Sequence, residues 1–216
     1  MRYDKFSYVW PARPEKAIPV NFINVYKRKG WVAQYKKNGT CNVLFVSPEG
    51  EVINMNRHGE EHRGWKPTNV SNSPFIEATK GEGWWVFLTE VLNNKVSGGP
   101  KDTHYIFDVM VADGEYLTGE TFEDRISMLE DIFLNGGEKE TDSHYIITPN
   151  VWLAKTVKND FKHVWNEINN SVGEGAPMNE GLVFKNPKAK LELPFKETSN
   201  NGWMVKCRVS HKNYNF

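Results

Sequence analysis

The chain has 216 residues, of which 39% are hydrophobic and 13% aromatic, so it can bury a sizeable core as one domain. Basic and acidic residues balance at 27 each, which excludes a protein-wide positive field, and contacts with nucleic-acid phosphates would have to come from a local patch. Two cysteines exclude a disulfide framework and no apolar run approaches membrane-spanning length, so we expect reduced thiols and a cytoplasmic protein.

Alternating apolar and polar residues predict antiparallel β-sheets flanked by helices, an α+β fold. Residues 1–20 are proline-rich and are expected to be irregular, apart from a turn of helix over 14–17. The elements expected next, in chain order, are strands over 31–35, 41–47 and 52–56, a loop over 59–74, a short helix over 75–79, strands over 83–93, 104–112 and 116–117, a helix over 122–133, a strand over 145–148, a helix over 154–169, and strands over 181–185 and 203–210.

The two longer helices are expected from the spacing of their apolar residues. Over 122–133 these residues recur every three or four positions, and Thr121 precedes them as an N-cap. Over 154–169 the apolar residues also fall on one face. Turns are expected at 48–50 and 113–114, where glycine follows a polar residue.

The stretch from Gln34 to Thr40 carries the strongest chemical signal. A lysine amine is a poor nucleophile while protonated and becomes a good one when cationic neighbours such as Lys37, or burial, lower its pKa. Asn38-Gly39 is expected to form a tight turn with positive φ that places Lys36 against a phosphate. The same dipeptide between two alternating runs is also the commonest signal for a simple β-hairpin, and that alternative stays open.

Further short blocks follow Lys36-Lys37-Asn38-Gly39 in a fixed order. They are Asn56-Arg57-His58-Gly59, Phe87-Leu88-Thr89-Glu90-Val91, Tyr105-Ile106-Phe107-Asp108-Val109-Met110, Glu180-Gly181-Leu182-Val183-Phe184-Lys185 and Val205-Lys206-Cys207-Arg208. In order and spacing, over about 170 residues, they resemble the blocks of the covalent nucleotidyltransferase superfamily, which comprises ATP-dependent DNA and RNA ligases and mRNA capping enzymes.

The resemblance implies roles for the residues of the first two blocks. Lys36 would attack the α-phosphate of ATP and keep AMP through a phosphoramidate bond. Gln34 would contact the adenine edge, since a glutamine both donates and accepts hydrogen bonds, and Tyr35 would belong to the same nucleotide site. Arg57 would hold the ribose or an incoming 5′-phosphate. Without the resemblance, Gln34 would be an ordinary strand residue and Arg57 a surface arginine.

The middle blocks imply contacts with ribose, base and metal. Glu90 would contact the ribose hydroxyls or help to hold a metal, and a carboxylate closing an apolar strand is not expected to be buried without a partner. Phe107 would stack on the adenine, although a phenylalanine in a strand is ordinarily core. Asp108 points to the opposite face of the strand and is expected to be structural.

The last two blocks imply charge stabilisation. Glu180 would organise Mg²⁺, or Mn²⁺, which neutralises the phosphates. Lys185 and Lys206 would place positive charge on the α-phosphate, where charge builds in the transition state. Arg208 stands where the family usually has a second lysine, which keeps the charge and changes its geometry. Lys36, Glu180 and Lys206 are therefore the expected catalytic residues.

The sequence thus predicts an ATP-dependent polynucleotide ligase with a ligase-type nucleotidyltransferase (ATP-grasp-like) domain over 1–216, in which 1–25 form an N-terminal extension. AMP would pass from Lys36 to the 5′-phosphate of a nucleic acid, and a 3′-OH would then attack to seal the ends and expel AMP. RNA is slightly favoured over DNA because Asn38 varies the nucleophile block. We expect a monomer without membrane contacts.

Three alternatives remain: a DNA ligase of the same mechanism, a capping-type guanylyltransferase that uses GTP, and a nucleotide- or nucleic-acid-binding module without chemistry. The joint presence of Lys36, Glu180 and Lys206 argues against the last. The family generally carries a C-terminal domain, often an OB-fold, whereas only residues 209–216 follow the last block, so no OB-fold domain is expected.

Overall fold

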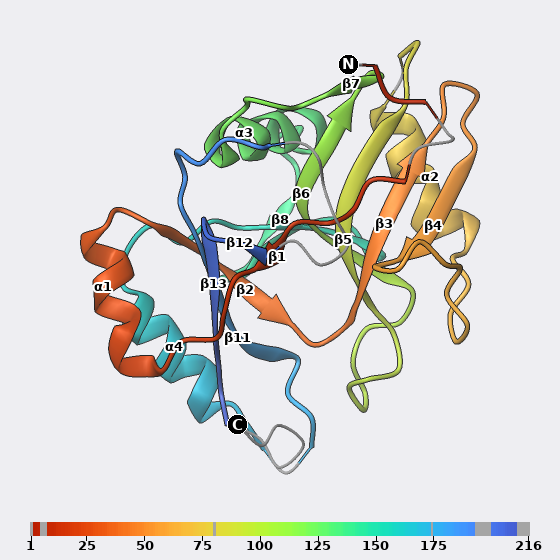
Figure 1. The fold of residues 1–216 in the computed structure, drawn as a ribbon. Coiled ribbons are helices and arrows are strands. Elements are labelled where there is room, and N and C mark those ends of the chain that lie inside the picture. Colours follow the sequence, from red (N-terminus) through yellow and green to blue (C-terminus); the bar gives the residue numbers. More distant parts are fainter. Residues whose placement is uncertain (1, 5–7, 80, 174, 193–199, 211–216) are drawn as a thin grey trace.

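The computed structural model describes residues 2–4, 8–79, 81–173, 175–192 and 200–210. Two sheets form the body of the protein, one of eight strands and one of three, and Figure 1 shows them side by side. The remaining residues lie outside this description. They include parts of three expected segments, namely the N-terminal extension, the loop before the last strand and the residues after the last block.

The large sheet runs in the order β4-β3-β5-β6-β10-β9-β8, with β7 paired to β6. Its pairings are antiparallel except for the parallel pair of β10 and β6. Its strands are β3 (Thr40–Val46), β4 (Val52–Asn56), β5 (Trp85–Leu92), β6 (Thr103–Ala112), β7 (Glu115–Tyr116), β8 (Lys139–Glu140), β9 (His144–Thr148) and β10 (Val151–Ala154).

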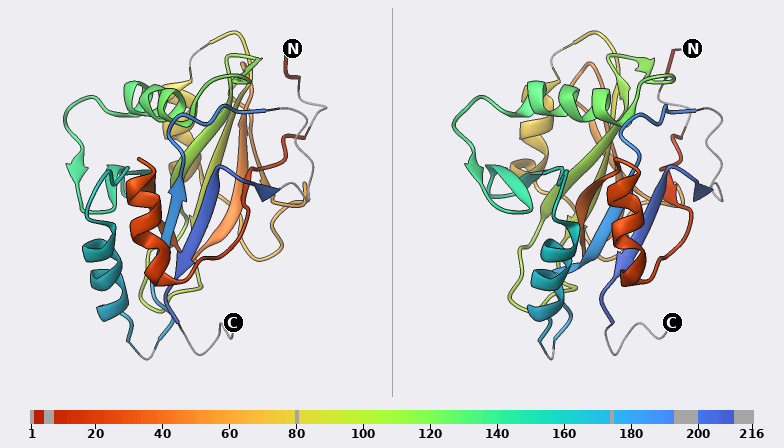
Figure 2. Two further views of the ribbon diagram at one scale, coloured as in Figure 1. Left: turned by 60° about the vertical axis from the view of Figure 1, so that its left-hand side comes forward. Right: turned by 90° about the vertical axis from the view of Figure 1, so that its left-hand side faces the viewer.

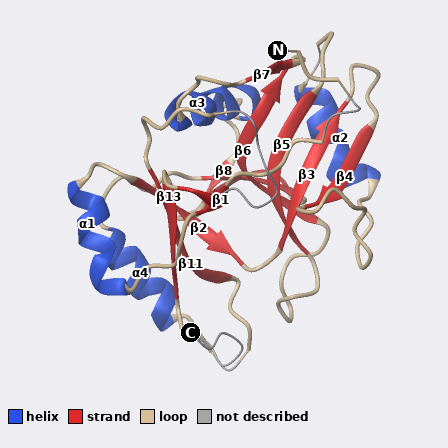
Figure 3. Cartoon of the chain, in the orientation of Figure 1, coloured by secondary structure: helices blue, strands red, loops and turns tan. Residues whose placement is uncertain are grey.

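Helices α2 (Asn69–Ala78) and α3 (Phe122–Phe133) pack on the large sheet, as Figure 3 shows. Phe75 of α2 and Phe133 of α3 both pack against Phe87 of β5, with ring centroids 5.4 and 5.8 Å apart. All three rings belong to the main buried cluster of the protein. Burial of such aromatic side chains contributes most of the free energy that holds these helices on the sheet.

The small sheet has the order β13-β11-β2 and is antiparallel throughout. Its strands are β2 (Val32–Lys37), β11 (Asn179–Lys185) and β13 (Met204–Arg208). Helices α1 (Ile23–Arg28) and α4 (Phe161–Asn170) cover one of its faces, as the right-hand view of Figure 2 shows. Within the described residues, no helix is both long and apolar enough to span a bilayer.

The small sheet has a helix-covered face and an opposite face that we call the site face. Alternate residues of its strands, such as Tyr35, Phe184 and Cys207, join the buried cluster beneath α1 and α4. Because successive side chains of a strand point to opposite faces, the residues between them turn away from the helices. The site face therefore carries Gln34, Lys36, Lys185, Lys206 and Arg208.

Residues 8–18 connect the two sheets. Near the large sheet, the Tyr8 hydroxyl donates to the Asn56 carbonyl at 2.7 Å. Further along, β1 (Arg13–Pro14) pairs in parallel with β12 (Asn200–Asn201), and the Ile18 amide donates to the Lys206 carbonyl at 2.8 Å. In Figure 1 this red segment crosses in front of both sheets, before the 3-10 helix η1 (Val20–Phe22) and α1.

The structure confirms the antiparallel-rich sheets, the flanking helices and the helix over 122–133. The Thr121 side chain accepts from the Asp124 amide, and Asp124 bonds back to the Thr121 amide, so the N-cap is a full capping box. The strand over 52–56 has the expected bounds, and the other main strands agree to within two residues at either end. Cys41 and Cys207 are both free thiols, as expected.

Three local expectations were wrong, and one helix was missed. The turn of helix over 14–17 is instead extended chain that pairs in parallel with β12 and β13. The helix over 154–169 begins at Phe161, because β10 continues to Ala154 and Val157 forms a bridge with Ala33. The loop over 59–74 contains the start of α2, which Thr68 caps and which tolerates an internal proline, Pro74. Helix α1 had no predicted counterpart.

Asp108 is structural, as expected, and pairs with the buried Arg125 of α3. Arg125 Nε lies 2.8 Å from Asp108 Oδ1, and Arg125 Nη2 lies 3.0 Å from Asp108 Oδ2. The guanidinium also donates to the Glu120 carbonyl at 3.0 Å and lies 5.7 Å from the centre of the Phe122 ring. This pair fixes α3 on β6.

Arg125→Met should lower the free energy of unfolding by about 3–5 kcal/mol, because it leaves the Asp108 carboxylate buried without its counter-ion. Urea denaturation measures the change. The matched control is Lys188→Met, which removes an exposed cation from a surface pair with Glu123 and should leave the free energy of unfolding almost unchanged. Equal losses in the two variants would contradict the assignment.

Candidate active site

The candidate site begins where the chain passes from the small sheet to the large one. Strand β2 ends at Lys37 and pairs with β11, whereas β3 starts at Thr40 and pairs with β4 and β5. Because β2 and β3 lie in different sheets, the alternative of a simple hairpin at Asn38-Gly39 was wrong. The connection instead joins the two sheets directly beside Lys36.

Gly39 serves close packing rather than a positive-φ turn, so that expectation was also wrong: Gly39 has no positive φ. A Cβ atom at this position would lie 2.5 Å from the Val91 carbonyl oxygen and 2.6 Å from Glu90 Cγ. The Gly39 amide donates to Glu90 Oε1 at 3.0 Å, and Lys95 Nζ donates to the Gly39 carbonyl. Asn38 is held too, because its amide donates to the Met178 carbonyl at 2.8 Å.

Lys36 and Glu180 form an ion pair at the centre of the site. Lys36 Nζ lies 2.5 Å from Glu180 Oε2, and the Lys36 side chain is 19% exposed against 7% for Glu180. Arg208 Nε lies 3.6 Å from the same carboxylate oxygen. One buried carboxylate thus faces two cations on the site face.

A β-bulge turns Glu180 toward Lys36. Asn179 is aligned with Lys37 and Gly181 with Lys36, so two residues of β11 oppose one residue of β2. Gly181 has φ of +140°, and a Cβ there would lie 2.0 Å from the Cys207 carbonyl oxygen. Only glycine fits, which gives the Glu-Gly pair in the sequence a geometric reason.

The site carries more positive than negative charge. Burial lowers the pKa of Lys206, and the like charges of Arg208, Lys36 and Arg13 lower it further, while Glu180 opposes them. Lys36, Lys206, Arg208 and Arg13 thus bring four positive charges together near the Glu180 carboxylate. Such an arrangement favours an anionic ligand.

Glu90 joins the site from β5. Burial raises its pKa, the cations Lys36 and Lys95 oppose that rise, and Glu180 adds to it. Beside it, burial and the Glu90 charge raise the pKa of the Cys41 thiol to about 12, so this cysteine stays a neutral thiol. The two carboxylates from different sheets thus lie close enough to interact.

Lys185, Gln34 and Phe107 form a buried group on the same face. Lys185 Nζ donates to Gln34 Oε1 at 2.7 Å and to the Phe107 carbonyl at 3.2 Å, and lies 4.3 Å from the Phe122 ring centre. Burial lowers the pKa of Lys185 to about 8. Gln34 Nε2 is buried without a hydrogen-bond partner, so this amide still requires an acceptor.

Two of the predicted site residues lie apart from this group. The Tyr35 side chain belongs to the cluster under α1 and α4, on the face opposite Lys36, and burial raises its pKa to about 12. Arg57 is exposed on the turn after β4, where its Nε donates to His58 Nε2 at 2.9 Å, and it lies at the edge of the site, since its charge acts on the Cys41 thiol as those of Arg13 and Lys36 do. The structure brings together the other eight: Gln34, Lys36, Glu90, Phe107, Glu180, Lys185, Lys206 and Arg208.

Arg13 and Lys95 were not predicted. Arg13 belongs to a segment expected to be irregular, and its parallel pairing with β12 is a tertiary contact that leaves no periodic signal. Lys95 lies in the loop after β5, where a single lysine has no distinguishing neighbours in the sequence. The position of Lys95 in the sequence, shortly after the block that contains Glu90, was the one signal that could have indicated it.

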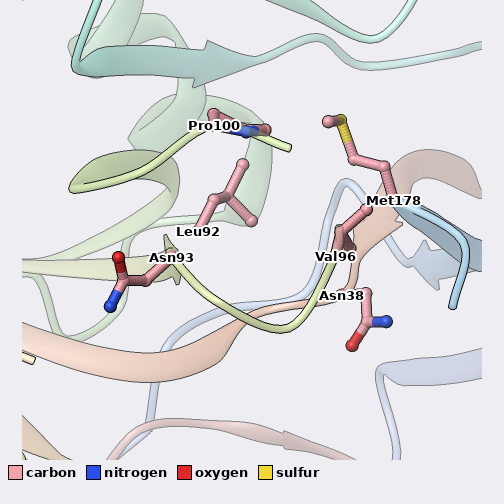
Figure 4. A pocket seen from close by; sticks show the side chains of 6 residues that line it. All are labelled: Asn38, Leu92, Asn93, Val96, Pro100 and Met178. Atoms are coloured by element: carbon pink, nitrogen blue, oxygen red, sulfur yellow. The ribbon is translucent and has the colours of Figure 1, made fainter. Parts of the chain in front are cut away.

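A small cavity lies on the other side of the β2–β3 connection (Figure 4). Its lining residues are Asn38, Leu92, Asn93, Val96, Pro100 and Met178. It contains none of the charged groups of the site and has room for about one water molecule. The site is therefore defined by its charged side chains on the site face and not by this cavity.

Comparison with known sequences gave no matching family model and no matching curated protein. The ligase domain from M. tuberculosis LigD superposes with a TM-score of 0.60 at 14% identity, over 93% of this chain and 59% of that one. Mycobacterial DNA ligase D complexed with ATP and MES gives 0.54 at 14% identity, over 93% and 58%. A protein named Pmar-Lig_Pre gives 0.60 at 13% identity, over 93% and 46%.

This chain therefore has the fold of those ligase domains. It spans between 46% and 59% of the length of these three solved structures.

Gly181→Ala should destabilise the protein more than Gly119→Ala does, in urea denaturation. Both glycines have positive φ, so both substitutions carry about 1–3 kcal/mol of backbone strain, but only at Gly181 would the new Cβ collide with backbone. Nothing lies within 4 Å of a Cβ at Gly119. Equal destabilisation would contradict the close packing at the bulge.

Stability should rise with pH between about pH 8 and pH 9, because Lys37 and Lys185 have pKa values near 8 when folded and 10.5 when unfolded. In that window the unfolded chain binds the extra protons, so each lysine contributes at most about 1.4 kcal/mol per pH unit. Above about pH 9, the buried thiols oppose the rise, because burial raises their pKa values from 9.0 to about 12 for Cys41 and about 11 for Cys207. Above about pH 10, tyrosines with raised pKa values, such as Tyr35, oppose it further.

Urea midpoints across this range provide the measurement. Lys185→Met should flatten the rise, whereas Lys188→Met, which removes an exposed lysine, should leave it unchanged. A wild-type midpoint independent of pH would contradict the burial of both ammonium groups.

Proposed function

We propose that this chain is the adenylation domain of an ATP-dependent polynucleotide ligase, with Lys36 as the nucleophile. The observation that carries the proposal is the 2.5 Å contact between Lys36 Nζ and Glu180 Oε2 amid an excess of positive charge. The fold shared with ligase domains, one of them complexed with ATP, supports it. The order of the six sequence blocks that carry the resemblance supports it as well.

In the first step, the lone pair of Lys36 Nζ attacks the α-phosphorus of ATP, and the bond to pyrophosphate breaks with its electron pair. The amine must lose its protons, and Glu180 Oε2 lies where it can accept one. Lys206 and Arg208 place fixed positive charge beside the reacting phosphate, where negative charge accumulates. Arg13 adds a further cation to this group.

Mg²⁺ or Mn²⁺ fits this donor set. Glu180 and Glu90 would hold it, since Mg²⁺ commonly takes one or two carboxylates together with substrate phosphates. The metal would neutralise phosphate charge during transfer.

The adenine would bind against Gln34 and Phe107. The Gln34 Nε2 group, buried without a partner, suits an acceptor nitrogen of the base. Lys185 already donates to Gln34 Oε1, which fixes the orientation of the amide. Lys185 would therefore position the Gln34 side chain that contacts the base, in addition to any contact that Lys185 makes with phosphate.

In the second and third steps, AMP passes from Lys36 to a 5′-phosphate end, and a 3′-hydroxyl then displaces AMP to form the phosphodiester. Asn38 in the nucleophile block favours RNA ends. The solved structure named as a DNA ligase favours DNA ends as the second candidate. The two are separated by experiment on matched nicks.

The test is sealing of a nick with 5′-phosphate and 3′-hydroxyl ends, in RNA and in DNA, with ATP and Mg²⁺. Wild type should seal at least one of them. Lys36→Ala should lose all sealing, and so should Lys36→Arg, because a guanidinium stays protonated. Lys206→Ala should slow AMP transfer by about 10²–10³-fold, the usual cost of one charge-stabilising donor.

Lys162→Ala is the matched control, since Lys162 is exposed on α4 and should leave sealing unchanged. Sealing by Lys36→Ala would overturn the assignment of the nucleophile. Labelling of the protein by GTP and not by ATP would favour the capping-type alternative.

A further inference from the structure

Lys37, the residue after the nucleophile, has its ammonium group buried on the face opposite Lys36. The residue is 3% exposed. Its Nζ lies 5.2 Å from the ring centre of Tyr105, 5.7 Å from that of Tyr35 and 6.0 Å from that of Trp152. Three aromatic faces of this kind stabilise a cation that has lost its water.

Two hydrogen bonds complete the surroundings of Lys37. Its Nζ donates to Ser143 Oγ at 2.9 Å and to Asn179 Oδ1 at 2.8 Å. A buried ammonium is tolerated only with such partners. Ser143 and the rings of Tyr105 and Trp152 belong to the large-sheet side, whereas Asn179 and Tyr35 belong to the small sheet, so one side chain ties the two sheets together.

The contact with Asn179 holds β11 on the far side of the bulge from the five regular pairs with β2. Asn179 and Lys37 are the last aligned pair before β11 shifts, and Glu180 and Lys36 are their immediate neighbours. Without the bulge, Glu180 would turn to the opposite face of the sheet, away from Lys36. The ion pair between Lys36 and Glu180 on the site face therefore depends on the contacts of Lys37 with Ser143 and Asn179 on the opposite face, which we call the clamp.

We propose that Lys37 is a positioning residue that holds the bulge at which the nucleophile meets its carboxylate partner. It takes no part in the chemistry, because its ammonium points away from the reacting atoms. The proposal rests on the proposed function only for its kinetic consequence. The structural consequence, a fixed bulge between β2 and β11, stands without it.

Two measurements on Lys37→Met test the role. The first is the rate of AMP transfer to the protein at saturating ATP, which should fall about 10²-fold with KM for ATP little changed, because misplacement by about 1 Å has that cost. The second combines Lys37→Met with Glu180→Gln. Glu180→Gln should slow wild type far more than it slows Lys37→Met, since the carboxylate is already misplaced there.

Amide hydrogen exchange gives a readout that does not require activity. In Lys37→Met, the Asn38 amide, which donates to Met178, and the Val209 amide, which donates to Glu180, should lose protection. Amides of α3 should keep theirs. If wild type forms no AMP adduct, the proposed function is overturned, and this exchange pattern still decides the role of Lys37.

Leu129→Ala is the matched control, because Leu129 is fully buried in the large-sheet core and does not contact the clamp. It should lower the melting temperature, keep the AMP-transfer rate below melting, and act additively with Glu180→Gln. If Lys37→Met does not fold, Asn179→Ala removes the hydrogen bond between Lys37 and Asn179 and leaves the Lys37 charge in place. It should give the same fall in the AMP-transfer rate and the same non-additivity with Glu180→Gln. Wild-type protection at Asn38 and Val209, or full additivity with Glu180→Gln, would overturn the proposal.

Discussion

The ion pair between Lys36 and Glu180 depends on one irregularity in the pairing of β2 with β11. A regular strand would turn Glu180 toward the helices, because its neighbours Leu182 and Phe184 fix the alternation of β11 with their burial under α1 and α4. The bulge at Glu180 and Gly181 adds one residue and reverses that direction. Much of the site follows from this one change of register.

The sheets that meet at this point are held from both sides. On the site face, Gly39 lets the chain pass close to β5, where Glu90 accepts from its amide. On the opposite face, the Lys37 ammonium binds Ser143 and Asn179. The nucleophile is thus placed between two fixed contacts, which limits its freedom before any ligand arrives.

Much of this site could be predicted from the sequence, since the residue types and their order carry its chemistry. Lys36, Lys206 and Arg208 share one face because strand alternation is a local property, whereas Glu180 reaches that face only through the bulge. The register of β11 could not be predicted, since it depends on Gly181 meeting the Cys207 carbonyl, a contact between strands. Arg13 was not predicted for the same reason, because only the pairing of β1 with β12 brings it near Lys206.

The fold shows the same division. Thr121 and the apolar spacing behind it specify α3 locally, and the structure agrees. The segment over 154–160 has similar spacing but is extended, because Val157 bonds to Ala33 of the small sheet. The Asn38-Gly39 dipeptide indicates a hairpin only when both flanking strands stay in one sheet, and here tertiary pairing separates them.

The most direct test of the central claim is mass spectrometry of the intact protein and its peptides after incubation with ATP and Mg²⁺. The account predicts one added adenylyl group, acid-labile as a phosphoramidate and located on Lys36. An unmodified protein under these conditions, or an adenylyl group on another residue, would contradict it.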